Sequence, residues 1–381
     1  MEETAGNGKW VWIILAIIVI GGGWWVLSRG TNNDTGPIKI GVIFPLTGDA
    51  AQVGEAARNI VEIALEKINA DGGINGRDIQ LIFEDGKCDG AGATSAAQKL
   101  INIDKVQVII GGFCSGESLA AIPVATQAKV ALFSPGSSNP QLTGISPYFA
   151  RSYPSDSMQG EVLADVATNR GIKKMAVLQE QTDYAVGLYT SFNNAFIAKG
   201  GETVKEEFPS TQTDLRTALT KLRSSNPDAV FAILQSPASA ERFFKQLREL
   251  GWKPKLYVGD VVVGFPDLIA ANKDLLEGAI AAEFTPDNNA SKFQEILSAY
   301  QEKYGEDPPM LAYVPGEYDS LFIIADAIRA VGYDGTKIAD WLHKNVKDWP
   351  GTAGAVTIGS NGDLVTGFQA EVFSDGKSSP L

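Results

Sequence analysis

Cysteine is scarce in this chain of 381 residues, which contains only Cys88 and Cys114. Two cysteines cannot complete a structural zinc site on their own, because such a site needs four ligands. They can form a disulfide bond or remain as two buried thiols. Both lie in loops after predicted strands, at 80–84 and 106–110, and neighbouring strand ends would bring these loops close together. A disulfide would place this part of the chain in an oxidising compartment.

Histidine occurs once, as His343, and no group of side chains has the spacing of a metal site. Residues 112–116 (Gly-Phe-Cys-Ser-Gly) have the form of a hydrolase elbow with Cys114 as nucleophile, and His343 follows in the order that a catalytic triad would need. A cysteine hydrolase is therefore one alternative. Short motifs match by chance and a disulfide would consume the thiol, so we predict that the protein is not an enzyme.

Positive charge is also in deficit, with 32 lysine and arginine residues against 45 aspartate and glutamate residues and a net charge of -13. No basic stripe is present, which argues against a nucleic-acid partner.

Gly72, Gly73 and Gly76 lack the G-x-G-x-x-G spacing of a dinucleotide site. We therefore predict no cofactor.

One apolar segment without charged residues stands near the start of the chain, at 10–28. A helix of that length would span about 28 Å, close to the hydrocarbon thickness of a bilayer. Tryptophans stand at both ends of the segment, as in an aromatic belt: Trp10, Trp12, Trp24 and Trp25. We predict a transmembrane anchor followed by a polar linker at 29–36. The alternative is a cleaved signal peptide with its cleavage site at 21–23.

The anchor and the disulfide together predict a location. With both, the protein would be a single-pass protein of the cell membrane, and its main part would lie on the extracytoplasmic side. No cysteine stands in the apolar segment to take a lipid instead.

Strands and helices alternate almost without interruption from residue 37 onward, which is typical of a doubly wound parallel sheet. The pattern pauses at 148–156 and restarts as a second series of similar size. A chain of this length is too long for one hydrophobic core, so we expect an α/β fold with two lobes. Further elements are predicted beyond residue 278: a strand at 279–282, helices at 290–304, 318–331 and 336–346, and late strands at 355–358 and 367–373.

The stretch from 106 to 140 reads as strand, serine-rich loop, helix, strand and a second serine-rich loop. Its apolar runs are short and rich in valine and isoleucine, like strands buried on both faces. Parallel strands end at one edge of a sheet, so the loops at 111–118 and 134–139 should emerge side by side, where open α/β sheets bind ligands. The free N–H groups of the helix favour an anion such as a carboxylate. We interpret this stretch as half of a small-molecule cleft.

Six ordered motifs resemble the branched-chain amino-acid-binding proteins of ABC uptake systems, which have the type I periplasmic-binding-protein fold. They are IKIGVIFPLTG, INADGGINGRDIQL, EDGKCD, GGFCSG, SPGSSNPQLT and SYPSDSMQG. The resemblance covers essentially everything from residue 37 and implies two lobes that close on a solute by hinge motion. It also implies a three-segment hinge and a disulfide between Cys88 and Cys114. It assigns residues 37–153 and 284–359 to lobe 1, and residues 154–283 and 360–381 to lobe 2.

The resemblance also implies the solute contacts of this chain. Ser115 and Ser138 correspond to hydroxyls that contact the carboxylate and ammonium ends of an amino acid. Gly136 corresponds to a main-chain contact, and Ser137 lies beside it. Tyr184 corresponds to an aromatic side chain that closes over the solute from lobe 2.

Three positions depart from the family pattern. Val53 and Gln235 stand where the family has aromatic residues, and the acid that pairs with an α-ammonium group falls on Val261. Asp260 is the nearest substitute, so Gln235 and Asp260 complete the predicted ligand-binding set. An unpaired buried ammonium group costs several kcal/mol, which disfavours an α-amino acid as the solute.

These features predict a solute-binding subunit of an ABC importer. It would act as a monomer, capture a small amino-acid-like or carboxylate solute, and deliver it to permease subunits without chemistry. The alternative from another class is a ligand-sensing receptor of the same fold, which would need a separate partner protein to report the ligand.

Overall fold

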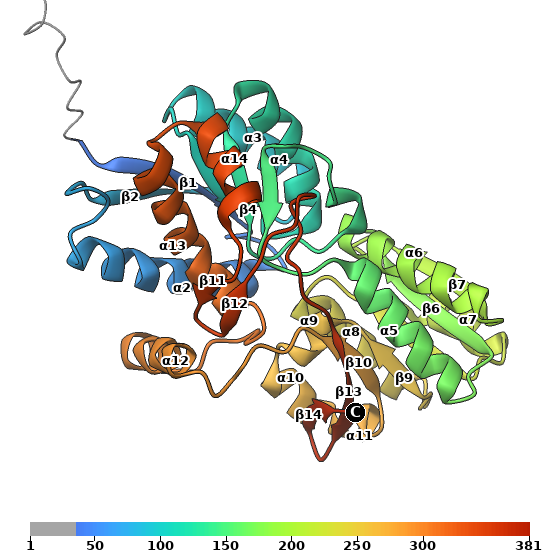
Figure 1. Ribbon diagram of the computed structural model, residues 1–381. Coiled ribbons are helices and arrows are strands. Elements are labelled where there is room, and N and C mark those ends of the chain that lie inside the picture. The colour runs from blue at the N-terminus through green and yellow to red at the C-terminus, as the bar shows by residue number, and fades with distance from the viewer. Residues whose placement is uncertain (1–35) are drawn as a thin grey trace, which may run out of the picture. The chain divides into compact units, whose positions relative to one another are not determined.

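The computed structural model describes residues 36–381 (Figure 1). The predicted anchor at 10–28 and all but the last residue of the predicted linker lie outside the described residues. Within residues 36–381, no helix combines the length and the apolar character needed to cross a bilayer.

The first sheet has five strands in the order β2-β1-β3-β4-β5, and every neighbouring pair is parallel. Strands β3 and β4 are buried throughout. Helices cover both faces of the sheet, which explains why these strands have no polar alternation. The five strands are β1 (Ile38–Phe44), β2 (Ile79–Asp85), β3 (Val108–Gly111), β4 (Ala131–Ser134) and β5 (Phe149–Arg151).

The helices of lobe 1 come from two distant parts of the sequence. They are α2 (Ala51–Ala70), α3 (Gly90–Asn102), α4 (Ser115–Ala128), α12 (Ser291–Tyr304), α13 (Val314–Val331) and α14 (Gly335–Asn345). Helices α3 and α4 pack side by side, and so do α2 and α13 (Figure 1). Successive residues of a strand point to opposite faces of the sheet. Ile43 and Ile109 pack with α3 and α4, whereas Val42 and Ile110 pack with α2 and α13.

The second sheet has seven strands in the order β14-β13-β10-β9-β8-β6-β7. They are β6 (Lys174–Glu180), β7 (Glu202–Phe208), β8 (Ala229–Ile233), β9 (Leu256–Val258), β10 (Ile280–Glu283), β13 (Gln369–Ser374) and β14 (Lys377–Pro380). The predicted parallel sheet is confirmed from β10 to β7, and the sheet adds an edge that the sequence did not predict, where β13 is antiparallel to both β10 and β14. Asp375 and Gly376, both with positive φ, form the two-residue turn that reverses the chain there.

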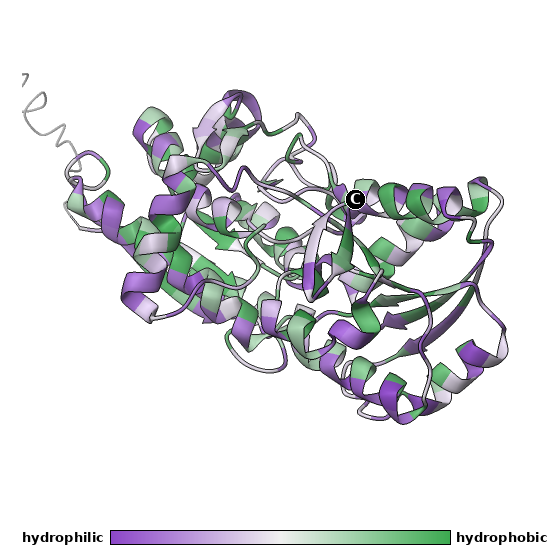
Figure 2. Ribbon diagram, turned by 90° about the horizontal axis from the view of Figure 1, so that it is seen from below, coloured by the Kyte–Doolittle hydropathy of each residue, from purple (hydrophilic) through white to green (hydrophobic). Residues whose placement is uncertain are grey.

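The helices of lobe 2 include three short ones that the sequence did not predict, α9 to α11. In Figure 2 the helices alternate between hydrophilic and hydrophobic residues, as expected where one face packs inward. The helices are α5 (Asp156–Asn169), α6 (Asp183–Ala198), α7 (Arg216–Ser224), α8 (Pro237–Glu249), α9 (Asp260–Val263), α10 (Pro266–Ala271) and α11 (Lys273–Leu276). The remaining elements are a 3₁₀ turn, η1 (Pro140–Leu142), and a hairpin of β11 (Trp349–Gly351) and β12 (Gly354–Val356).

The two sheets share one strand order, although no sequence repeat relates them. The order β2-β1-β3-β4-β5 in lobe 1 matches β7-β6-β8-β9-β10 in lobe 2. In each sheet the order reverses beside its first strand, and such a switch point is where open α/β sheets bind ligands.

The chain passes between the two sheets after β5, after β10 and after β12. The predicted lobe boundaries near residues 153 and 359 fall within these connections, and the one near 283 falls at the last residue of β10. The exact limits of the lobes stay predictions. Three segments of the chain therefore join the two sheets, which is the number that the predicted three-segment hinge requires.

Candidate functional site

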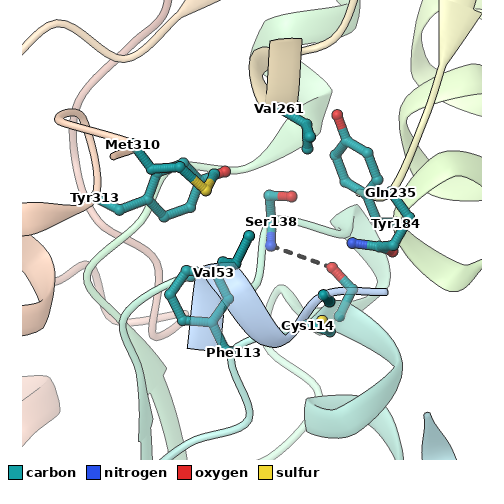
Figure 3. A pocket seen from close by; sticks show the side chains of 12 residues that line it. Val53, Phe113, Cys114, Ser138, Tyr184, Gln235, Val261, Met310 and Tyr313 are labelled. Carbon is teal, nitrogen blue, oxygen red and sulfur yellow. Dashed lines mark hydrogen bonds between the residues drawn. The ribbon is translucent and has the colours of Figure 1, made fainter. Parts of the chain in front are cut away.

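A cavity lies where loops from both sheets meet (Figure 3). The loops follow β1, β3 and β4 in lobe 1 and β6, β8 and β9 in lobe 2. These are the carboxyl ends of parallel strands at both switch points. The lining residues are Ala50, Val53, Phe113, Cys114, Ser115, Gly136, Ser138, Tyr184, Gln235, Val261, Met310 and Tyr313.

Ser115 joins the two serine-rich loops of lobe 1. Its Oγ accepts hydrogen bonds from the backbone N–H groups of Ser138 (3.3 Å) and Asn139 (3.1 Å). The two loops therefore emerge side by side, as the sequence predicted. A hydroxyl has one proton to donate besides its lone pairs, so Ser115 can still donate to a solute in the cavity.

Ser138 lines the cavity and donates a hydrogen bond to Asp156 Oδ2 at 2.9 Å. Burial raises the pKa of Asp156 well above its ordinary value, and the nearby charge of Asp260 raises it further. A protonated Asp156 can donate to Ser138 instead, which frees the serine hydroxyl to donate to an anion.

Gly136 and Ser137 have different positions relative to the cavity. Gly136 lines it, and a Cβ at this position would come within 3.0 Å of the Phe113 ring, so the glycine lets the aromatic ring pack closely. Ser137 is fully buried behind the lining, where its hydroxyl bonds to Ser118 (2.7 Å) and to the carbonyl oxygen of Gly112 (2.9 Å).

Lobe 2 contributes Tyr184, Gln235 and Val261 to the cavity wall. Gln235 is anchored by its backbone, whose N–H donates to Glu180 Oε2 at 2.8 Å, and its side chain points into the cavity (Figure 3). Tyr184 is buried, and its hydroxyl donates to Asp260 Oδ1 at 2.5 Å. Asp260 itself, at the start of α9, is fully buried and does not line the cavity.

Arg151 is a residue of this site that the sequence did not reveal. It is fully buried at the end of β5, and its Nε contacts Asp363 Oδ1 at 2.8 Å. Its Nη1 donates to the carbonyl oxygens of Ser137 (3.2 Å) and Asn139 (3.0 Å), which flank Ser138. One guanidinium group thus fixes the second serine-rich loop to the connection between β12 and β13.

Four more residues of the cavity wall also escaped prediction: Ala50, Phe113, Met310 and Tyr313. Phe113 lies in the motif GGFCSG, and its position as an aromatic residue in a serine-containing loop was the signal that could have identified it. Met310 and Tyr313 precede α13, and nothing local in the sequence distinguishes them from ordinary core residues.

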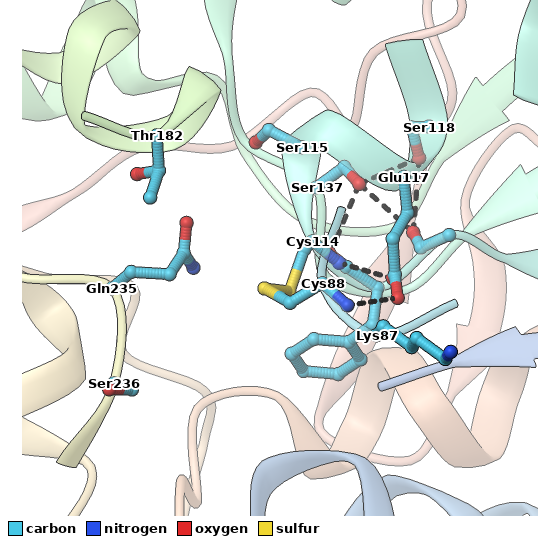
Figure 4. The surroundings of a disulfide bond; sticks show 12 residues. Lys87, Cys88, Cys114, Ser115, Glu117, Ser118, Ser137, Thr182, Gln235 and Ser236 are labelled. Carbon is cyan, nitrogen blue, oxygen red and sulfur yellow. Dashed lines mark hydrogen bonds between the residues drawn. A yellow bond between two sulfur atoms is a disulfide. The ribbon is translucent and has the colours of Figure 1, made fainter. Parts of the chain in front are cut away.

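The Cys88–Cys114 disulfide is confirmed, with a Cα–Cα distance of 5.3 Å (Figure 4). The sulfur of Cys114 is bonded to that of Cys88, so the cysteine hydrolase alternative lacks its nucleophile. His343, on α14, is not among the residues that line the cavity.

Glu117 ties the two cysteine loops together beside the disulfide. Its Oε1 accepts from the backbone N–H of Cys88 and its Oε2 from that of Cys114, both at 2.9 Å (Figure 4). Burial raises the pKa of Glu117 from 4.5 to about 8, against the lowering effect of these hydrogen bonds.

The free energy of unfolding should therefore fall as the pH rises from about 5 to about 8. Folded Glu117 keeps its proton up to a pKa of about 8, whereas the unfolded chain releases it near 4.5. In this window the folded state binds more protons, so raising the pH favours unfolding by up to about 1.4 kcal/mol per pH unit. Urea unfolding across this range measures the slope, and Glu117→Gln should reduce it.

Glu302→Gln is the matched control, because Glu302 is exposed on α12. The pKa of Glu317 is also raised to about 8 and that of Asp319 to about 7, both chiefly by burial, so some slope should remain in Glu117→Gln. Equal slopes in the wild type and Glu117→Gln would contradict this account.

The family model for periplasmic binding proteins matches residues 37–370. The chain belongs to the periplasmic binding protein family. It is 30% identical over 311 residues to an amino acid binding protein from Pseudomonas aeruginosa, covering 80% of this chain and 82% of the relative. The cavity therefore lies between the two lobes of a periplasmic binding protein.

Solved structures of this family have the same fold. A leucine-binding protein, LivK, from Thermotoga maritima is 29% identical with a TM-score of 0.81, covering 90% of this chain and 97% of that one. An ABC-transporter solute-binding protein from Rhodopseudomonas palustris, in complex with 3,4-dihydroxybenzoic acid, is 26% identical with a TM-score of 0.77, covering 91% of this chain and 96% of that one.

Proposed function

We propose that this periplasmic binding protein captures a small carboxylate solute between its lobes and delivers it to the permease of an ABC importer. The observation that carries the proposal is the cavity itself, which both lobes line and into which Ser115 can donate a hydrogen bond. The start of α4 lies at the same wall, and its N–H groups favour an anion. Leucine and dihydroxybenzoic acid, named for two of the similar structures, both carry a carboxyl group.

Closure of the lobes is the proposed mechanism, and it needs contacts that form only when the lobes meet. Asn139 of lobe 1 donates to the carbonyl oxygen of Asp183 in lobe 2 at 2.6 Å. The N–H of Met310 donates to the carbonyl oxygen of Gly264 at 2.7 Å, and Arg242 pairs with Asp49 at 3.0 Å. A solute that touches both walls binds the closed state more tightly, so it shifts the population toward closure.

The proposal includes a location on the extracytoplasmic side of the cell membrane. The disulfide supports an oxidising compartment, since such bonds persist there. Residues 10–28 would tether the protein as a transmembrane anchor, and the permease would be its partner in the same membrane.

Ser115→Ala should weaken solute binding by about 10- to 100-fold, because a hydrogen bond to a charged group contributes about 1.5 to 3 kcal/mol. A thermal-shift screen of amino acids and organic carboxylates first selects the strongest ligand, and calorimetry then measures its affinity for both proteins. Ser95→Ala in α3 is the control, because Ser95 is exposed and its hydroxyl bonds only to the carbonyl oxygen of Ala91. Equal affinities for the wild type and Ser115→Ala would refute the proposed site.

A further inference from the structure

Asp260 is a buried carboxylate whose oxygens are already occupied by tyrosine hydroxyls. Tyr184 donates to Oδ1 and Tyr313 to Oδ2, both at 2.5 Å. The hydroxyl of Tyr153 lies 3.0 Å from Oδ2 and also 3.0 Å from Glu283 Oε1, so it can donate to Asp260 and accept from a protonated Glu283. The tyrosines come from lobe 2, from the segment before α13 and from the connection after β5. Hydrogen bonds of this kind satisfy a buried carboxylate without a cationic partner.

The same tyrosines separate Asp260 from the cavity. Tyr184 and Tyr313 both line the cavity, whereas Asp260 does not, so a solute there meets the two tyrosines and not the carboxylate. The ring of Tyr313 stacks on Tyr153 at 4.0 Å between centroids and on Phe113 at 5.5 Å. The hydroxyl of Tyr184 packs closely against Gly259, where a Cβ would lie only 2.5 Å from the hydroxyl oxygen.

The other carboxyl groups near Asp260 offer no substitute. Glu283 and Asp156 are buried and do not line the cavity, and burial raises the pKa of each well above its ordinary value. A protonated acid attracts a cation poorly. No aspartate or glutamate stands among the residues that line the cavity, within the part of the chain that the structure describes.

The rest of the cavity wall is largely apolar. Val53, Phe113, Val261, Met310 and the ring of Tyr313 surround the space, and Gln235 is the polar side chain contributed from beyond β8. An ammonium group placed here would lose its water and find no negative charge. A carboxylate, by contrast, meets the hydroxyl of Ser115 and the start of α4.

We propose that the solute is a monocarboxylate without an ammonium group, with an aliphatic or aromatic body. Three tyrosine hydroxyls replace the ammonium group as the partners of Asp260. This inference rests on the proposed function, because it names the solute class of the same cavity. It separates this chain from relatives described as amino-acid-binding.

Matched pairs of solutes test the inference on the full chain. Leucine is compared with 4-methylpentanoate, and phenylglycine with phenylacetate, since the members of each pair differ only in the amino group. Calorimetry and thermal melting should show that the acid without the amine binds at least about 100-fold more tightly in one or both pairs.

Each outcome decides a different question. If an amino acid binds as tightly as its partner or more tightly, the inference is wrong, while capture of a carboxylate stands. If none of the four binds but the amides leucinamide or phenylacetamide do, both the inference and the proposed capture of a carboxylate are wrong. If nothing in the set binds, the inference is wrong for both solute bodies that it names.

Discussion

Replacing Arg151 by methionine is expected to abolish solute binding and to lower the free energy of unfolding by about 3 to 5 kcal/mol. The substitution keeps an unbranched apolar stem but leaves Asp363 without its cation, and that carboxylate is only 14% exposed. It also leaves the carbonyl oxygens of Ser137 and Asn139 without their donor.

The loss of binding follows from what those carbonyl groups flank. Ser138 lies between them and lines the cavity, and the N–H groups of Ser138 and Asn139 donate to Ser115. Without the guanidinium group, the carbonyl oxygens of Ser137 and Asn139 can turn toward water. This change in the loop displaces Ser138 and Ser115 from the positions in which they contact the solute. Binding depends on such placement within fractions of an ångström.

Urea unfolding and calorimetry measure the two effects of Arg151→Met. Arg216→Met is the control, because Arg216 lies on the surface of α7 with Asp214 and Glu249 as partners and is 55% exposed. The double variant Arg151→Met with Asp363→Leu removes both charges, so it should recover part of the stability but not the binding. Wild-type affinity in Arg151→Met would show that Arg151 does not hold the second serine-rich loop in place.

Gly187→Ala should reduce solute affinity by about 100-fold or more without destabilising the lobes. Gly187 lies on α6, and a Cβ there would come 2.8 Å from the side-chain amide of Asn139, which belongs to the other lobe. That amide cannot move away easily, since it donates to the carbonyl oxygen of Asp183 and accepts from the N–H of Gln141. The added methyl group therefore opposes closure, on which affinity depends.

Stability separates this effect from simple misfolding. Alanine is a better helix former than glycine by about 1 kcal/mol, so the variant with open lobes should unfold at the same urea concentration as the wild type or at a higher one. Small-angle scattering with and without the strongest ligand would follow closure. Gly367→Ala is the control, since a Cβ there meets nothing within 4 Å. An unchanged affinity in Gly187→Ala would contradict the proposed closure.

The sequence predicted the parts of the fold that depend on local pattern. The alternation of strands and helices from residue 37 onward was predicted, because short runs rich in valine and isoleucine, such as that of β1, indicate buried strands. Helices α9 to α11 were missed, since segments of four to six residues are too short to show helical periodicity. The turn at Asp375-Gly376 was missed although this dipeptide is a strong hairpin signal.

The candidate site was predictable where the chain itself brings residues together. Ser115 and Ser138 follow successive strands of one sheet, so the topology places them side by side. The contact of Arg151 with Asp363 joins residues 212 positions apart, and Tyr313 reaches Asp260 from 53 positions away. No local pattern encodes such meetings, because tertiary packing alone determines them.

The late arrival of α13 affects how this protein is made. The last strand of the first sheet ends at Arg151, yet helix α13, which covers one face of that sheet, begins only at Val314. While the ribosome synthesises the intervening segment, Val42 and Ile110 have no cover from that helix. The nascent chain therefore exposes an apolar surface while this segment is made, and it should depend on a chaperone or on export in an unfolded state.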